Sequence, residues 1–146
     1  PIEKQSKTFS ELWVPVPDMT NINYSLSVKE YASFFRMLYN GSYLAPKTSE
    51  EALSILASST YENGLRGWVR KDISIAHKFW EREYMYENWT TLNQLHDCGI
   101  VYHPNYPYLV CIMTRGNTPL ETLGSAIRDT SKIIFDEIDS RYPNKK

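Results

Sequence analysis

The chain has 146 residues, a length that fits one domain with its own hydrophobic core. Hydrophobic residues make up 42% and charged residues 23%, and the formal net charge of −1 gives no electrostatic reason to expect a nucleic acid or an anionic membrane as a partner. No apolar run approaches the length of a membrane span, and no targeting signal is recognised. We expect the chain, which starts at "PIEKQSKTF", to be a processed or excised piece of a longer protein.

The part of the chain before residue 60 is expected to contain an extended lead-in and two helices. Pro15 and Pro17 stand close together in "WVPVPDM", which favours an extended chain over residues 1–23. Apolar residues then recur at helical spacing, which predicts two helices within residues 24–60. A polar, glycine-containing connection follows the second helix.

Three capping boxes are expected to mark the starts of helices. In each box, a Ser or Thr side chain accepts a hydrogen bond from the backbone N–H three residues later, and a Glu at that position accepts one in return. The third box also puts a proline at the first helical position, which suits a helix start. The three pairs are Ser27 and Glu30, Thr48 and Glu51, and Thr118 and Glu121.

Residues 73–116 are expected to form three antiparallel strands, and residues 118–141 a long amphipathic helix. The predicted fold class is α+β, a three-stranded antiparallel sheet flanked by helices, within a single domain or fragment that spans residues 1–146. Turn residues bound the strand candidates, which cover residues 74–84, 95–103 and 106–116.

The two cysteines, Cys98 and Cys111, each fall inside a strand candidate. They could face each other across a hairpin, but the preferred interpretation is two buried thiols. The histidines His77, His96 and His103 do not combine with them in a metal-ligand spacing, so no metal site is expected. A glycine-rich phosphate loop is absent from the sequence as well, and no cofactor is predicted.

The segment "SIAHKFWEREY", residues 74–84, combines basic, aromatic and acidic side chains on one strand candidate. Alternation places Lys78 and Trp80 on one face and His77 and Phe79 on the other. Taken alone, this pattern favours a solvated edge strand that is protected from pairing by its charges. The alternative interpretation is a functional lysine, and the order of the surrounding elements supports it.

Two helices, a lysine-bearing strand, a hairpin and a long closing helix resemble the C-terminal half of class A β-lactamases and related penicillin-binding serine hydrolases. In that family one strand carries Lys-Thr/Ser-Gly, and a following strand often reads Asp-x-Gly-Ile-Val, which Asp97, Gly99, Ile100 and Val101 match here. The resemblance extends from about Asn21 onward. It implies the fold of the family's C-terminal portion.

The resemblance also implies which residues belong to the site. Lys78 would be the lysine of Lys-Thr/Ser-Gly, and the backbone N–H of Glu81 would be one donor of the oxyanion hole. The side chains of Phe79, Trp80 and Cys98 would lie in the substrate-binding part. All three depart from the family pattern, because Phe79 replaces a hydroxyl residue, Trp80 replaces a glycine and would stand in the cleft, and Cys98 stands where many class A enzymes have an arginine.

The serine nucleophile of this family lies in Ser-x-x-Lys, and neither that tetrapeptide nor Ser-Asp-Asn occurs in the sequence. In the family, two N-terminal strands extend the sheet beyond the strand equivalent to residues 106–116. That strand would therefore have a bare edge in this chain. We expect a partner along this edge, either the missing N-terminal half or a second copy of the chain.

Two functional hypotheses follow from the resemblance. The first is the C-terminal part of a serine hydrolase that acts through an acyl-serine on a β-lactam, peptide or ester, and that is inactive alone. The alternative is a non-catalytic binding or self-assembling module on the same scaffold, which an indole at position 80 would favour. An unrelated α+β domain is the least favoured interpretation. The resemblance further implies an extracytoplasmic location.

Overall fold

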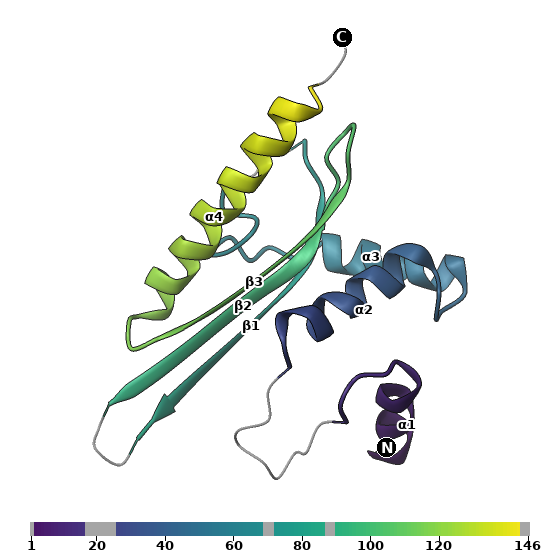
Figure 1. Cartoon of the computed structure of the whole chain (residues 1–146), viewed down its shortest axis with the longest axis horizontal. Helices are drawn as coiled ribbons and strands as arrows, with labels where there is room; N and C mark the ends of the chain where they lie inside the picture. Colours follow the sequence, from purple (N-terminus) through teal and green to yellow (C-terminus); the bar gives the residue numbers. More distant parts are fainter. Residues whose placement is uncertain (1, 17–25, 69–71, 87–89, 144–146) are drawn as a thin grey trace.

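The computed structural model describes residues 2–16, 26–68, 72–86 and 90–143. The strands form one antiparallel sheet in the order β1-β2-β3. Figure 1 shows α4 along one face of this sheet, and α2 and α3 against the other face. The predicted α+β class, a three-stranded antiparallel sheet flanked by helices, is confirmed. The elements are α1 (Ile2–Glu11), α2 (Val28–Asn40), α3 (Pro46–Ala57), β1 (Ile75–Met85), β2 (Thr91–Val101), β3 (Tyr108–Gly116) and α4 (Leu120–Arg141).

The two faces of the sheet carry separate parts of the core, because successive side chains of a strand point to opposite faces. The face that packs on α4, called the α4 face below, holds the larger cluster. Its buried members include Ile75, Leu95, Val101, Val110, Leu123, Ile127 and Phe135. The opposite face, called the α2 face, packs Cys98 and Ile100 against Phe35 of α2. The sheet is therefore the middle one of three layers.

Residues Ile2–Glu11 form α1, so the expected extended lead-in over residues 1–23 is wrong for this part. The helix is held by tertiary contacts. The ring of Phe9 meets that of Phe34 in α2 edge to face, with centroids 5.8 Å apart, and the Tyr43 hydroxyl donates a hydrogen bond of 2.7 Å to Glu11. The two prolines on which the expectation rested follow the helix in the sequence and leave it unbroken. Residues 17–23 lie outside the described residues.

The capping box at the start of α2 is confirmed. The backbone N–H of Glu30 donates to the Ser27 hydroxyl, and the backbone N–H of Ser27 donates to the Glu30 carboxylate at 2.7 Å. The hydrogen bond from the Ser27 backbone N–H, together with the Ser27 side chain, holds the pKa of the Glu30 carboxyl below its usual value, because it stabilises the charged form. Gly41 then ends the helix with φ of 58°, the left-handed conformation that glycine adopts without strain.

The other two capping boxes are wrong, because a proline is the first residue of α3 and another is the N-cap of α4. The helix α3 begins at Pro46, two residues before Thr48, and has no side-chain cap. The N-cap of α4 is Pro119 and not Thr118, whose carbonyl accepts a 2.9 Å hydrogen bond from the Asn93 amide. A proline fits the first turn because the N–H it lacks has no partner inside the helix.

The strands have slightly different bounds from those expected. The largest change is in β2, which begins at Thr91 and not at residue 95, so that residues 86–90 alone connect it to β1. This strand ends at Val101 and β3 starts at Tyr108, which leaves Pro104 and Pro107 in the connection. Prolines are excluded from paired strand positions because they lack the N–H that the ladder needs.

Candidate functional site

The open edge of β1 directs the backbone N–H of Glu81 away from the sheet. At the two ends of β1, the N–H of Tyr102 donates to the carbonyl of Ser74, and the N–H of Tyr86 donates to that of Thr90. Both bonds continue the pairing of β1 with β2, and both fall at even-numbered residues on the β1 side. Backbone direction alternates along an antiparallel strand, so its odd-numbered residues point their N–H and C=O groups outward. Within the described part of the chain, no further strand pairs with this edge.

Lys78 lies at the same edge, and its side chain is exposed. Its Nζ atom is 5.1 Å from the ring centroid of Phe79. Neighbouring side chains start on opposite faces of a strand, so this contact bends the lysine over the edge rather than across the α2 face. The ammonium group therefore lies beside the row of outward-pointing backbone groups to which the Glu81 N–H belongs.

Trp80 starts from the α2 face, two residues along from Lys78, as alternation predicts. Its indole is 43% exposed and stacks on the imidazole of His96, with ring centroids 5.7 Å apart and planes 21° from parallel. His96 is its direct partner on β2. Burial lowers the pKa of the His96 imidazole, because the charged form loses solvation.

The side chain of Phe79 lies on the α4 face of the sheet, opposite to Trp80. Its ring packs on the α4 face against Tyr61, which lies in the connection between α3 and β1, with centroids 3.5 Å apart and planes 10° from parallel. Burial raises the pKa of the Tyr61 hydroxyl to about 12, with further contributions from the charges of Glu81 and Asp97. The Phe79 side chain thus joins the core and fixes this connection against β1.

Cys98 is buried beneath Lys78, its partner on β1, and forms a disulfide with Cys111 of β3. The preferred interpretation of two buried thiols is therefore wrong. The two residues are direct partners in the register, with Cα atoms 4.0 Å apart, which is within reach of a disulfide. As a buried disulfide, Cys98 offers neither a charge nor a hydrogen-bond donor to a ligand.

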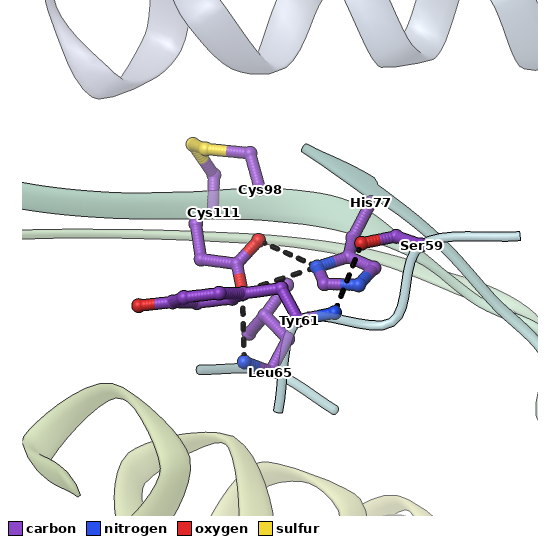
Figure 2. Close-up of polar contacts among 7 residues, drawn as sticks. Ser59, Tyr61, Leu65, His77, Cys98 and Cys111 are labelled. Carbon is purple, nitrogen blue, oxygen red and sulfur yellow. Dashed lines mark hydrogen bonds and ion pairs between the residues drawn. A yellow bond between two sulfur atoms is a disulfide. The ribbon is translucent and has the colours of Figure 1, made fainter. Parts of the chain in front are cut away.

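A buried histidine–aspartate pair under the site was missed by sequence reasoning. The Nδ1 atom of His77 lies 2.9 and 3.1 Å from the two carboxylate oxygens of Asp97, and both side chains are fully buried. The same carboxylate accepts a 2.9 Å hydrogen bond from the backbone N–H of Leu65. Figure 2 shows His77, Leu65 and the Cys98–Cys111 disulfide together in this region. The Asp97 carboxylate thus joins the connection that holds Tyr61 to the lysine-bearing strand.

Only the register reveals this pair. Asp97 is the direct partner of Phe79, so His77 is its diagonal neighbour on the same face. Gly64 allows the connection to approach, because a Cβ atom there would collide with the Asp97 carboxylate. A signal was present in the sequence, since His77 and Asp97 occupy the interior face of two strands that were both predicted, but their pairing was not.

The described residues form neither a metal-ligand cluster nor a membrane-spanning helix. Among them, no cluster of three or more His, Cys, Asp and Glu side chains could hold a metal ion. None of the described helices is both long enough and apolar enough to cross a membrane.

Comparison with known proteins identifies the family. The family model of the β-lactamase enzyme family matches residues 5–138, which is most of the chain, and the chain belongs to this family. A search of curated proteins found no match.

Solved structures with the same fold are β-lactamases and a penicillin-binding-type protein. PBP-A is 22% identical, with a TM-score of 0.67 over 92% of this chain and 50% of its own, and a mutant of it was solved as an acyl-enzyme complex with penicillin G. The TLA-1 extended-spectrum β-lactamase is 15% identical, with a TM-score of 0.71 over 90% of this chain and 52% of its own. A class A β-lactamase from Bacteroides cellulosilyticus is 19% identical, with a TM-score of 0.65 over 77% and 41%. The chain spans about half the length of these structures.

Proposed function

We propose that this chain forms the strand side of a serine-hydrolase active site and needs a nucleophile from another segment to act. In this proposal, Lys78 attracts the carboxylate of a β-lactam, peptide or ester, and the backbone N–H of Glu81 stabilises the oxyanion of the acyl-transfer step. The sequence contains no Ser-x-x-Lys, so the chain alone would be inactive.

The observation that carries this proposal is the common direction of two groups at the open edge of β1. The Glu81 N–H points outward from the edge, and the Lys78 ammonium bends over the same edge. A cation and a free backbone donor on one edge are what an acyl-transfer site needs to hold an anionic substrate and its tetrahedral intermediate. The acyl-enzyme formed by a mutant of PBP-A gives the reaction class by analogy of family.

The alternative is a non-catalytic binding or self-assembling module, and two side chains favour it. The Trp80 indole is half-exposed on the α2 face, where the family motif has glycine. Phe79 brings no hydroxyl and turns to the α4 face. A substrate lying along β1 would therefore meet an indole and find one fewer hydrogen-bond donor.

The edge of β3 supports a partner in either case. The Cα atoms of Cys98 and Cys111 are 4.0 Å apart, a spacing that is typical of a non-hydrogen-bonded pair in an antiparallel sheet. The backbone N–H and C=O groups of Cys111 and Met113 therefore point away from β2. No described strand pairs with them. A strand from a nucleophile-bearing segment, or from a second copy of the chain, would satisfy these groups.

The disulfide also supports the extracytoplasmic location that we propose for this chain. Disulfides persist in oxidising compartments and are rare in a reducing cytosol. Cys98 and Cys111 would form a stable bond in such a compartment.

Hydrolysis of a chromogenic cephalosporin tests the proposed function. We expect no turnover by the chain alone, and turnover when it is mixed with an equimolar family half that carries Ser-x-x-Lys. Lys78→Ala should abolish the recovered turnover. Trp80→Gly should raise it, because removing the indole opens the strand to the substrate.

A matched pair of proline substitutions tests the oxyanion donor. Glu81→Pro removes only an outward N–H and should lower turnover with the fold intact, whereas Arg82→Pro removes a ladder bond and should unfold the edge strand. Turnover by the chain alone, or unchanged turnover in a folded Glu81→Pro variant, would overturn the proposal. If the Trp80→Gly mixture remains inactive, the non-catalytic module is the correct function.

A further inference from the structure

Trp80 and Arg82 lie on the α2 face of β1, and Lys78 starts from the same face and bends its ammonium group over the adjoining open edge. Lys78, Trp80 and Arg82 alternate along the strand and so share one face. Arg115 of β3 lies across the sheet from Arg82, with Gln94 of β2 between them. From strand geometry, the Cα atoms of Lys78 and Arg82 are about 13 Å apart, and those of Arg82 and Arg115 about 10 Å apart. We call these four residues, Lys78, Trp80, Arg82 and Arg115, the cationic surface.

Charges are segregated between the two faces of the sheet. The carboxylates of the strands belong to Glu81, Glu83 and Asp97, and all three start from the α4 face. None of the three cations of the cationic surface forms an ion pair with another described residue. The cationic surface therefore has positive charge that its own strands do not neutralise.

The indole of Trp80 is held in a fixed orientation at the centre of this surface. His96 covers one side of the ring, from the direction of β2. The guanidinium of Arg82 lies 5.9 Å from the Trp80 ring and 3.9 Å from that of Tyr84, so it is held along the strand by two aromatic rings. Trp80 is 43% exposed, so part of the indole remains open to solvent.

We propose that the cationic surface binds a carboxylated polysaccharide, with one sugar ring packed on Trp80. The C–H face of a sugar ring is apolar and flat enough to pack on an indole, while its hydroxyls stay in water. Carboxylates on either side of that ring would reach Lys78 and Arg82, and Arg can bind a carboxylate with two parallel hydrogen bonds. Binding of this ligand needs no serine nucleophile, so it can be tested independently of hydrolysis.

Nucleic acid fits this surface less well. A single strand carries a phosphate at each nucleotide and is bound by grooves that neutralise many of them, whereas the cationic surface has three cations on a chain of net charge −1. A short carboxylated oligosaccharide needs only two of its carboxylates to reach Lys78 and Arg82, on either side of the sugar ring that packs on Trp80.

Calorimetric titration of the full chain with an oligogalacturonate of six residues tests this proposal. We expect binding that weakens as NaCl rises, because dissolved ions screen the attraction between charged groups that water reaches. Trp80→Ala and Arg82→Gln should each weaken binding by about tenfold, and Trp80→Phe should retain part of the affinity because it keeps a ring. The matched neutral oligosaccharide, the same oligogalacturonate with its carboxylates methyl-esterified, should bind at least tenfold more weakly.

Two control variants separate this surface from the rest of the molecule. Trp13→Ala removes an indole that is 94% exposed beyond α1, and Lys132→Gln removes an exposed cation from α4. Neither should change the affinity. Circular dichroism of each variant checks that the fold is retained. The proposal is overturned if the oligogalacturonate does not bind, if folded Trp80→Ala and Arg82→Gln bind it unchanged, or if an oligonucleotide of equal charge binds more tightly.

Discussion

Cys98 and Cys111 are direct cross-strand partners on β2 and β3 and are joined by a disulfide, with Cα atoms 4.0 Å apart. The bond therefore fixes the register of the last two strands. It also lies under Lys78, because Lys78 is the partner of Cys98 on the other side. The lysine-bearing strand is thus built on a pair of strands whose alignment is covalently set.

Removing the disulfide should destabilise the chain. The bond closes a loop with a sequence separation of 13, and a loop of this size is expected to contribute about 3 kcal/mol to the free energy of unfolding. The double variant Cys98→Ala with Cys111→Ala should show this loss in urea denaturation. A reductant present during unfolding should bring the unsubstituted chain to the same midpoint and leave the double variant unchanged. Equal midpoints without reductant would contradict the disulfide.

Replacing Asp97 should loosen the connection before β1. Its carboxylate accepts hydrogen bonds from His77 and from the Leu65 N–H, and a buried donor without a partner costs about 1–3 kcal/mol. Asp97→Ala should therefore lower the free energy of unfolding by about 3 kcal/mol or more. Asp97→Asn should lose less, because its amide oxygen still accepts one bond. Hydrogen exchange should show faster exchange at the Leu65 amide in both variants.

Asp139 supplies the control for this experiment. Its carboxylate also accepts a hydrogen bond from a buried histidine, His103, at 3.0 Å, but it is about half exposed. Water can replace the lost partner there, so Asp139→Asn should cost less than about 1 kcal/mol. If the two aspartates were equally sensitive, burial would not explain the effect at Asp97.

His96 should make the stability of the chain depend on pH in the mildly acidic range. Its pKa is lowered in the folded chain, chiefly by burial, whereas in the unfolded chain it takes up a proton at about pH 6.5. As the pH falls below this value, the unfolded state binds the proton first, and the free energy of unfolding decreases. Melting temperatures measured between pH 7.5 and 5.5 should fall less steeply for His96→Gln. An unchanged slope would contradict the role of this residue.

A pair of proline substitutions should test the open edge of β3. Met113 directs its N–H outward, while Ile112 directs its N–H into the ladder with β2. If the chain self-associates through this edge, Met113→Pro should shift it to a smaller species in size-exclusion chromatography while leaving the circular dichroism intact. Ile112→Pro should lose sheet signal instead. A well-folded monomer of the unsubstituted chain would rule out self-association along β3.

Most of the fold was accessible from the sequence, because strands and helices leave periodic patterns. The three strands, the capping box of Ser27 and Glu30 and the face shared by Lys78 and Trp80 all follow from local spacing. The helix α1 was missed because ten largely polar residues gain their helical stability from contacts such as that of Phe9 with Phe34. Such contacts join distant parts of the chain and leave no local pattern.

The site could be predicted from the sequence only in part, because it too depends on contacts between distant parts of the chain. The disulfide and the pair of His77 with Asp97 both depend on which residue of one strand lies opposite which residue of the next. Two cysteines inside predicted strands can lie opposite each other or on different faces of the sheet, depending on a shift of one residue in the strand register. Family resemblance drew attention to Lys78, Trp80 and Glu81, but it does not predict that the indole of Trp80 stacks on His96.

The segregation of charge between the two faces of β1 makes this strand intolerant of insertions and deletions. One residue added before Lys78 would rotate every following side chain to the other face. Glu81 and Glu83 would then replace Lys78 and Arg82 toward α2, and Trp80 would be driven into the α4 core. Point substitutions could adjust this surface one residue at a time, whereas a single inserted codon would reverse its charge and bury its only indole. Length variation among relatives should therefore fall in the segments flanking β1 and be absent from the strand itself.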